Sequence, residues 1–577
     1  MRGTKIPIFL SIFFLVIFLI PVIYLIYGSY FFKFGGPSKS FTEIVFSPLT
    51  SKLFVNTIIY AVGGAAVATT LAVIYAWIIV RTDVPGKRFF ELLPVLPLTM
   101  PFIVKSFAWI YLFSPRIGIV NILIKQIFGI GPVFNIFSME GMIFALGMGG
   151  VPLVYLTVEP AIRAMNPTLE EASRVSGDSL LRTFRKVTLP ILLPAILSAF
   201  ILLTIIGMEN FDYPFMLGHP VGIDTLATEV YFWIYESTPP RYVNAAYLST
   251  IYIAMTFAAV CLYVYVTRQA YKFVVITGKA PYQTVHRLGK WKYVAFAVCF
   301  IIIFFVFLLP FGTILLMSFT PFLYLGGGAV NLTFTLDNYI KAINLPLLYR
   351  ALTNSILLGL AAGIAATLIA LILSYAALKS KVKGARLIEL ISSIPLAFPG
   401  IVYGLALFWT FLLFPGISKL LYGTIWCMVL ALIFIRLPYC VRIISGNLIQ
   451  IADELEESSR VAGASWGRTF FNVILPLLRR GLTNSFLYTF INSLRELGAI
   501  IILATPGSIV LTSLLIQLYS QHAMALNIIA AASAILCLLI MVSLSIPSIY
   551  EYLSRKYIMK RHETKKVSFV GKNRSNK

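Results

Sequence analysis

The chain has 577 residues, of which 59% are hydrophobic and only 12% are charged. Because soluble domains carry about 25% charged residues, this composition excludes an ordinary soluble protein. The formal net charge of +24 leaves nucleic acid or anionic lipid open as partners, and the positions of the basic residues along the chain decide between them.

Apolar segments long enough to cross a membrane recur along the whole chain. A helix needs about 20 residues to span the hydrocarbon core of a bilayer. Twelve segments satisfy this requirement, in chain order 6–31, 52–80, 91–113, 139–162, 188–218, 243–267, 293–319, 351–378, 388–414, 420–441, 475–505 and 525–550. The sequence therefore predicts an all-α, polytopic membrane protein with about 12 transmembrane helices.

The first segment begins like a secretory signal peptide, because Arg2 and Lys5 precede it. Its apolar stretch nevertheless continues from Ile6 to about Tyr30 without the small-residue pattern of a cleavage site. We therefore expect this segment to remain as the first transmembrane helix.

The basic residues are unevenly divided between the two sides of the predicted membrane. When loops are assigned alternately from the N-terminus, 34 of the 46 Lys and Arg residues fall on the N-terminal side, nine on the other side and three within spans. The positive-inside rule then predicts a multi-pass protein of the cell (plasma) membrane with both termini in the cytoplasm. The basic tail after residue 554 lacks an RNA-binding pattern, so we expect it to contact membrane lipid and not nucleic acid.

The chain also repeats itself. At an offset of 298 residues Pro101 aligns with Pro399. At an offset of 286 residues Gly177 aligns with Gly463, and the 12-residue difference lies in a longer loop of the first half, near 114–138. Since six spans per half is an even number, both halves cross the membrane in the same direction, as two homologous six-helix halves around an axis along the membrane normal.

This repeat sets the predicted domain boundaries. We expect a first half at 1–267 with its core repeat at about 52–267, a cytoplasmic linker at 268–292, a second half at 293–554 with its core repeat at about 350–550, and a basic cytoplasmic tail at 555–577. The linker is basic and interrupted by glycine and proline, which is typical of a connector.

The strongest local pattern lies in the predicted cytoplasmic loop between the fourth and fifth spans of each half. The two copies are EASRVSGDSLLRTFRKVTLP, beginning at Glu171, and ESSRVAGASWGRTFFNVILP, beginning at Glu457. Each predicts a short helix, a left-handed turn at glycine and a second short helix. The alternative is an ordinary surface loop with internal ion pairs, Glu170 to Arg174 and Glu456 to Arg460.

This pattern resembles the EAA loop of binding-protein-dependent ABC importer permeases. The resemblance implies the type I ABC importer permease fold, with a docking loop for a separate ABC ATPase in each half. The docking residues that it implies are Glu171, Ala172, Ser173, Gly177, Glu457, Ser458, Ser459 and Gly463. The second copy has serines where the motif has alanines, but the side chains stay small.

The ATPase itself is expected on another polypeptide. Every Gly-Lys pair in the chain is followed by a residue other than Ser or Thr, so no Walker A sequence is present. The four histidines have no metal-ligand spacing, and no catalytic constellation is apparent. We therefore predict no enzyme activity, no catalytic or metal site and no cofactor in this chain, with ATP used by the partner.

Six ionisable residues fall at membrane depth, where charges are costly and face a cavity or one another. They are Lys105, Glu209, Asp212, Arg436, Arg495 and Glu496. One interpretation is a translocation pathway for a hydrophilic solute. The other is ion pairing between helices, such as Glu209 with Arg495, and the sequence favours neither.

Fused double-length permeases of this kind resemble the ferric-iron importer permeases. The resemblance implies two copies of the ATPase, an extracytoplasmic solute-binding protein and, as the leading guess, ferric iron as cargo. Related permeases for thiamine, polyamine, phosphonate, sulfate or sugar are alternatives. A secondary transporter is an alternative of another class, although the loop RTDVPGKR at 81–88 fits it poorly.

Overall fold

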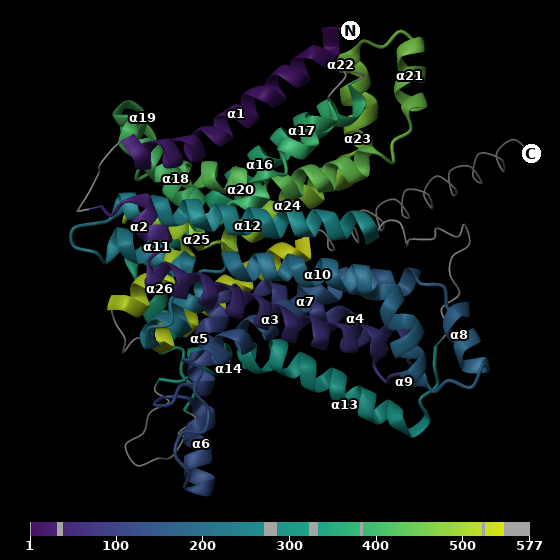
Figure 1. Ribbon diagram of the computed structural model, residues 1–577, viewed down its shortest axis with the longest axis vertical. Helices are drawn as coiled ribbons and strands as arrows, with labels where there is room; N and C mark the ends of the chain where they lie inside the picture. The colour runs from purple at the N-terminus through teal and green to yellow at the C-terminus, as the bar shows by residue number, and fades with distance from the viewer. Residues whose placement is uncertain are drawn as a thin grey trace, which may run out of the picture.

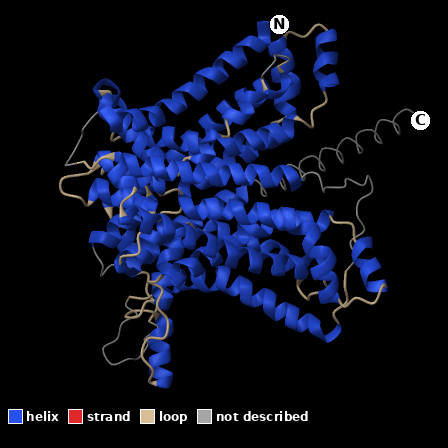
Figure 2. Cartoon of the chain, in the orientation of Figure 1, coloured by secondary structure: helices blue, strands red, loops and turns tan. Residues whose placement is uncertain are grey.

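The computed structural model describes residues 2–31, 38–270, 285–321, 333–380, 385–521 and 526–546. The predicted basic tail at 555–577 and residues 271–284 of the predicted linker lie outside these ranges. Helices make up most of the described chain (Figure 2), whose β-type pairing is a single bridge between Thr82 and His286. The predicted all-α class is confirmed.

The helices of the first half are labelled in Figure 1. They are α1 (Arg2–Phe31), α2 (Phe41–Val45), α3 (Pro48–Arg81), α4 (Lys87–Leu92), η1 (Leu93–Thr99), α5 (Phe102–Phe113), α6 (Ile119–Phe128), α7 (Met139–Ala164), α8 (Thr168–Val175), α9 (Leu180–Thr183), η2 (Phe184–Thr188), α10 (Leu189–Glu209), η3 (Pro214–Gly218), η4 (His219–Val221), α11 (Leu226–Tyr235) and α12 (Tyr242–Ala270).

The second half repeats this order with few changes. Its helices are η6 (Gly289–Trp291), α13 (Lys292–Ile303), η7 (Phe304–Leu308), α14 (Leu309–Phe319), α15 (Asp337–Ile343), α16 (Pro346–Lys379), α17 (Arg386–Ile391), η8 (Ile394–Ala397), α18 (Gly400–Leu413), α19 (Pro415–Leu421), α20 (Ile425–Leu448), α21 (Asp453–Val461), α22 (Trp466–Thr469), η9 (Phe470–Ile474), α23 (Leu475–Leu477), α24 (Arg479–Arg495), α25 (Gly498–Leu503), α26 (Leu511–Gln521) and a last helix, Leu526–Ile546.

Two of the predicted spans are sharply bent. Within the described ranges nine helices are long and apolar enough to cross a membrane, and the number rises to 11 if each of two bent helix pairs is one span. The bends, 98° between η1 and α5 and 97° between η8 and α18, fall at Pro101 and Pro399. Proline forces the preceding residue out of the helical conformation, so 91–113 and 388–414 are each two helices at nearly a right angle.

Two further predicted spans are interrupted near their charged residues. In 188–218, α10 ends at Glu209 and the next residue is extended. In 475–505, α24 ends at Arg495, Glu496 is extended, and α25 is a separate short helix. At 17 residues α24 is shorter than the helices that qualify as spans, so no single helix of the described chain spans 475–505.

Each half is built on a long central helix, and the first helices are exchanged between the halves. In the first half α3 packs on α7 and α10, and in the second α16 packs on α20 and α24. However, α1 packs on α16 and α18 of the second half, while α13 and α14 pack on α3 and α5 of the first. Figure 1 shows α1 and α13 on opposite flanks of the molecule.

Aromatic side chains and close glycine contacts hold the exchanged helices in place. Phe18 of α1 lies 6.0 Å from Phe434 between ring centres, and Phe296 of α13 lies 5.3 Å from Phe90. A Cβ atom on Gly28 of α1 would lie 3.0 Å from the Trp409 ring, so α1 approaches α18 closely because this position has no side chain.

Candidate functional site

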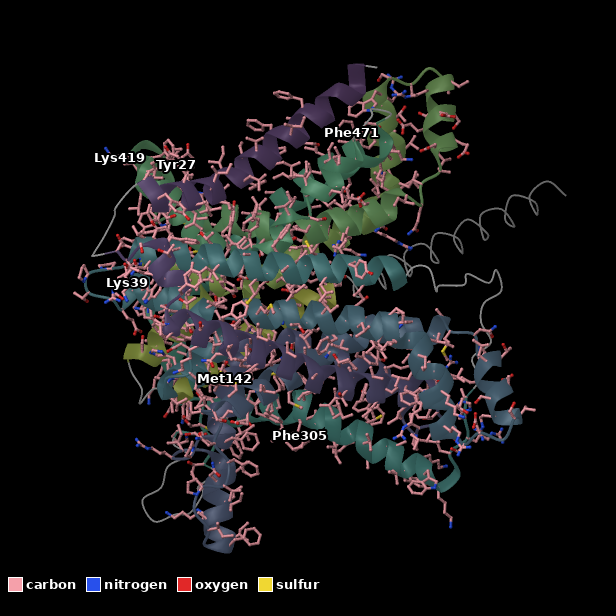
Figure 3. All side chains as sticks on the ribbon, viewed as in Figure 1. Tyr27, Lys39, Met142, Phe305, Lys419 and Phe471 are labelled. Carbon is pink, nitrogen blue, oxygen red and sulfur yellow. The ribbon has the colours of Figure 1, made fainter. Side chains whose placement is uncertain are left out.

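Both predicted docking loops lie at one end of the molecule. The first comprises α8, a turn at Gly177 with φ of 92°, α9 and η2, and the second comprises α21, a turn at Gly463 with φ of 86°, α22 and η9. The beginning of α1 lies at the same end of the molecule (Figure 1). Phe471 of the second loop also lies there, whereas Lys39 and Lys419 lie at the opposite end (Figure 3).

The predicted docking residues divide into outward and inward side chains. Six of the eight are exposed, namely Glu171, Ala172, Gly177, Glu457, Ser458 and Gly463. The second small residue of each copy instead joins the two short helices, since the hydroxyl of Ser173 lies 3.1 Å from that of Thr183 and the hydroxyl of Ser459 lies 3.0 Å from that of Thr469. These hydroxyl contacts explain why serine suits this position.

The exposed face of each loop also carries an apolar side chain that the sequence analysis did not single out. Val175 and its repeat equivalent Val461 are each 89% exposed. Exposed valines at equivalent positions of two loops, next to exposed carboxylates, form a surface that a partner protein can cover. Their signal in the sequence is the shared Arg-Val pair within the repeat.

The base of the first loop is a buried ion pair. Glu170 Oε2 lies 3.3 Å from Arg81 Nε, and both side chains are 1% exposed. Thr188 donates a hydrogen bond of 2.6 Å to the same carboxylate. Burial raises the pKa of Glu170, but the hydrogen bond from Thr188 and the proximity of His286 and of the Arg81 charge outweigh it, so the net pKa lies below its ordinary value. The alternative pair of Glu170 with Arg174 is therefore wrong.

The second loop is anchored differently. Tyr375 donates a hydrogen bond of 3.1 Å to Glu456, and Arg460 lies 3.9 Å from the same carboxylate. The Glu456–Arg460 pair therefore forms as the surface-loop alternative expects, at a distance typical of a weak exposed pair.

The last basic residue of the long central helix links each loop to a second span. Arg81 donates hydrogen bonds of 3.1 Å to the carbonyl groups of Ile162 and Met165, at the end of α7. Its repeat equivalent Lys379 donates one of 3.0 Å to Ile451, just beyond α20. A cation at the C-terminal end of a helix is favoured by the helix dipole. Each loop is thus tied to two long helices of its half.

A cavity of about 50 Å³ lies between the halves. Its walls come from α10 and α12 of the first half and from η8 and α20 of the second. The polar lining residues are Glu209, Tyr263, Arg436, Tyr439 and Arg442, and the rest of the wall is apolar. The sequence singled out Glu209 and Arg436 but not Tyr263, Tyr439 and Arg442, because tyrosine is common along the chain and Arg442 was assigned to a loop.

The ion pair at this cavity differs from the predicted one. Arg436 lies 2.5 Å from Glu496 and also donates to the Asn492 carbonyl group at 3.3 Å. Glu209 and Arg495 do not form an ion pair in the described structure. Since the Arg436–Glu496 pair lies within the second half, the charges at the cavity do not bridge the halves as the Glu209–Arg495 example supposed.

The remaining three candidates, Lys105, Asp212 and Arg495, lie away from the cavity. Lys105 is 2% exposed and Asp212 is 7% exposed. In the described part of the chain, Lys105 Nζ, Asp212 Oδ1 and Arg495 Nε have no hydrogen-bond partner, and none of the three residues lines the cavity. The ammonium group of Lys105 lies 5.6 Å from the centre of the Phe102 ring. Their role in the pathway stays a prediction.

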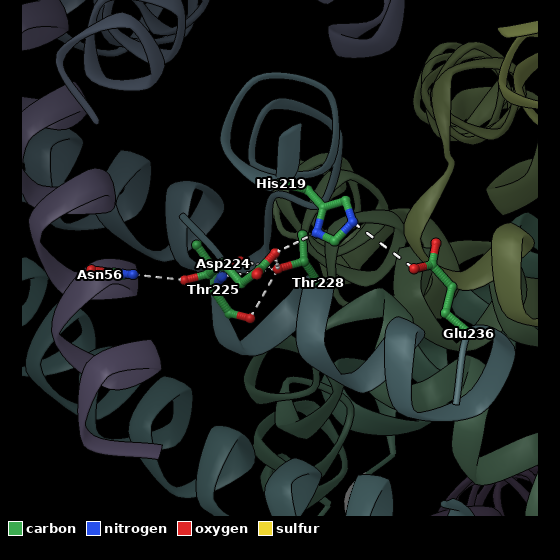
Figure 4. A network of polar contacts seen from close by, with 6 residues as sticks. All are labelled: Asn56, His219, Asp224, Thr225, Thr228 and Glu236. Atoms are coloured by element: carbon green, nitrogen blue, oxygen red, sulfur yellow. Dashed lines mark hydrogen bonds and ion pairs between the residues drawn. The ribbon is translucent and has the colours of Figure 1, made fainter. Parts of the chain in front are cut away.

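A polar network lies at the start of α11, on the side of the molecule away from the docking loops (Figure 4). His219 Nδ1 lies 2.9 Å from Asp224, and its Nε2 lies 3.9 Å from Glu236. Asn56 of α3 donates to the Asp224 carbonyl group at 2.9 Å. In the second half the equivalent Asn354 donates to a backbone carbonyl in the same way. The asparagine contact is thus common to both halves.

The first half adds a half-buried carboxyl group to this network. Burial, together with the nearby charge of Asp224, raises the pKa of Glu229 on α11 to about 7, while His219 and Arg241 oppose the shift. Across the described residues no group of three or more His, Cys, Asp or Glu side chains has an arrangement that could hold a metal ion.

Comparisons with known proteins give this arrangement a context. Residues 68–273 and 366–559 both match the family described as binding-protein-dependent transport system inner membrane component. A ferric transport system permease protein of Actinobacillus pleuropneumoniae is 25% identical over 76% of this chain, and an Fe(3+)-transport system permease protein of Haemophilus influenzae is 24% identical over 80% of it.

Coverage of the relatives is incomplete. The chain spans 62% of the length of the first of these proteins and 83% of the second. A molybdate/tungstate transport system permease protein of Pyrococcus abyssi is 27% identical over 29% of this chain and 64% of its own length. The two matched segments of the family contain the two docking loops.

Proposed function

Because the chain belongs to the family of binding-protein-dependent transport system inner membrane components, we propose that it is the membrane-spanning permease of an ATP-driven importer. In this proposal a hydrophilic solute passes between the two halves. The chain supplies the pathway, and a separate ABC ATPase, present in two copies, binds and hydrolyses the ATP. An extracytoplasmic binding protein delivers the solute.

The observation that carries the proposal is the pair of matched loops at one end of the molecule. Their glycine turns have nearly equal φ values, and their exposed valines have equal exposure. Two equivalent exposed surfaces suit a partner present in two copies. Since Arg81 and Lys379 tie each loop to two long helices, a movement of the loop is transmitted to the wall of its half.

This supports an alternating-access mechanism. When the two ATPase copies close on ATP, they draw the docking loops together, and the halves rock against each other around the cavity between them. The cavity would then open toward the binding protein, and release of phosphate would reverse the movement. The bent helices η8 and α18 meet beside the cavity at Phe398, so they move with its wall.

Ferric iron is the leading candidate for the cargo. Two relatives that match most of this chain are named for ferric transport. The cavity offers a carboxylate and two phenol groups, which are oxygen donors, and two guanidinium groups that oppose tight retention of a bare cation. Sulfate, molybdate, sugar, thiamine, polyamine and phosphonate stay as alternatives within the family. A secondary transporter is no longer an alternative, because the family match excludes it.

Reconstitution tests both levels of the proposal. The permease, its ATPase and its binding protein would be placed in liposomes, and uptake of radioactive ferric iron would be measured with ATP and with a non-hydrolysable analogue. ATP-dependent uptake of iron, competed by no oxyanion, supports the full proposal. Uptake of another solute overturns the iron assignment only, and failure of the permease to bind any ATPase overturns the importer itself.

A further inference from the structure

The linker between the halves touches the first docking loop. Its residues 285–288, hereafter the linker strap, run beside the end of α3. The His286 amide donates to the Arg81 carbonyl group at 2.8 Å, and the His286 carbonyl group accepts from Asp83 at 3.3 Å. The Leu288 amide donates to the Asp83 carboxylate at 2.9 Å. Three hydrogen bonds therefore hold the strap against the chain that follows α3.

The side chain of His286 reaches the buried base of the loop. Its Nε2 atom lies 3.8 Å from Glu170 Oε2, and the imidazole is 10% exposed. Glu170 thus has three partners around one carboxylate, since Arg81 and Thr188 contact it as well. Because the carboxylate is shielded from water, each of these contacts restrains it more strongly than it would at the surface.

The second docking loop has a different set of partners. Glu456, the repeat equivalent of Glu170, is contacted by Tyr375 from α16 and by Arg460 from its own short helix. The side chain of Arg460 is 48% exposed, so its pairing is weak. Both partners belong to the second half, whereas the strap belongs to the linker and leads directly into η6 and α13.

We infer that His286 is a positioning residue for the first docking loop, and that the linker strap makes the two loops mechanically unequal. The strap joins the base of the first loop to α13, which itself packs on α3. The first loop therefore has a restraint from the linker, whereas the second loop is held to α16 by the Lys379–Asp453 ion pair and by a hydrogen bond of 3.0 Å from Trp466 to Tyr375. This inference rests on the proposed function in one respect, the assignment of the two loops as docking sites for the ATPase.

Hydrogen exchange on the full-length permease without its ATPase tests the restraint alone. We expect His286→Ala to speed exchange in the first loop, residues 168–188, roughly tenfold, with the second loop, residues 453–474, unchanged. Arg287→Ala, an exposed neighbour, is the matched control and should change neither loop. Equal exchange in His286→Ala and Arg287→Ala would overturn the inference.

A second pair of variants protects the test against misfolding. Asp83→Ala removes the acceptor for Leu288 and should speed exchange in the first loop, whereas Asp83→Asn keeps an acceptor oxygen and should restore protection. Tyr375→Phe removes the contact to Glu456 and should speed exchange in the second loop only. If His286→Ala or Asp83→Ala changed hydrogen exchange in both loops, the strap would not act on the first loop alone, and the inference would be contradicted.

The positioning role needs a readout of coupling. In the complex with the ATPase, we expect His286→Ala to raise the ATP hydrolysed per solute transported by at least about twofold, without a change in melting temperature. If His286→Ala speeds hydrogen exchange in the first loop but leaves the ratio of ATP hydrolysed to solute transported unchanged, the strap has a purely structural role. That result would overturn the positioning claim. If the permease binds no ATPase, the exchange experiment still decides whether the strap restrains the loop.

Discussion

The half-buried carboxyl group of Glu229 makes the end of the molecule away from the docking loops sensitive to pH. Its pKa of about 7 lies above the ordinary value of 4.5, so the folded protein keeps the proton that the unfolded chain loses. The stabilisation is fully present below about pH 4.5 and is lost as the pH rises to about 7. Burial is the largest cause of the raised pKa, the nearby charge of Asp224 adds to it, and His219 and Arg241 oppose it.

We therefore expect the melting temperature of the purified protein to fall between pH 5 and pH 8, and Glu229→Gln to remove part of that fall. The free energy involved is a few kcal/mol at most, on the order of 1.4 kcal/mol per unit of pKa shift. Glu140→Gln, at an exposed position, is the control. Identical pH profiles for Glu229→Gln and wild type would contradict this assignment.

The ion pair of Arg436 and Glu496 is the second decisive feature at this scale. Both side chains are mostly buried, at 14% and 16% exposure. Removing one partner of a buried pair leaves the other charge uncompensated, which costs more than the pair itself contributes. Glu209, which lines the same cavity as Arg436, can replace Glu496 as the partner of Arg436 only in part.

Glu496→Gln should lower the free energy of unfolding by about 2–4 kcal/mol, measured by thermal unfolding in detergent. Glu454→Gln, an exposed acid on α21, should leave it unchanged. In the double variant Arg436→Met with Glu496→Gln, much of the loss should be recovered. A double variant that is simply the sum of its single variants would mean that the two charges do not interact.

The docking loops are defined at the scale of the element by their glycine turns. Gly177 and Gly463 have φ values in the left-handed region, and a Cβ atom at either position would meet nothing within 4 Å. Substitution there costs backbone strain of about 1 kcal/mol and causes no clash. Any effect on function would therefore come from the shape of the loop.

We expect Gly177→Val with Gly463→Val to abolish stimulation of the ATPase by the permease while the melting temperature falls only slightly. Each single variant should lose only part of the stimulation. Gly467→Val is the matched control, because Gly467 lies in the second docking loop, has open space around it and has no positive φ. Loss of stimulation in the control as well would mean that the turns have no special role.

Features of these elements that depend on neighbouring residues could be predicted from the sequence, whereas features that depend on remote residues could not. The glycine turns and the two short helices follow from local pattern, so both loops were placed correctly. The inward direction of Glu170 was missed, because the local partner Arg174 competes with Arg81, which is remote in the sequence. The bends at Pro101 and Pro399 were missed because a continuous run of apolar residues does not reveal where the chain changes direction.

At the scale of the whole molecule, the exchange of first helices joins the two halves. The sequence predicted the halves from their repeat but gave no sign that α1 packs on the second half and α13 on the first. The packing partners of a uniformly apolar helix depend on the shape of its surface and not on the hydrophobic pattern of its sequence. They can therefore be identified only in the folded structure. The cavity between the halves was anticipated through Glu209 and Arg436 only.

Crowding the contact between α1 and α18 should loosen this junction. A leucine at position 28 would clash with Trp409, so Gly28→Leu should lower the free energy of unfolding by about 1–3 kcal/mol, measured by melting in detergent. Gly312→Leu, on α14 with nothing within 4 Å of its Cβ position, is the control. If Gly28→Leu melts like the control, α1 does not press on α18 as the structure shows.

The exchanged helices also have a consequence for the order in which the protein is made. The ribosome delivers α1 to the membrane long before α16 and α18 exist, so α1 must wait in lipid without its final neighbours. The segments containing α1 and α13 are the two most hydrophobic spans of the described chain, which lets each remain in the bilayer alone. Assembly of the first half is thus completed only during synthesis of the second.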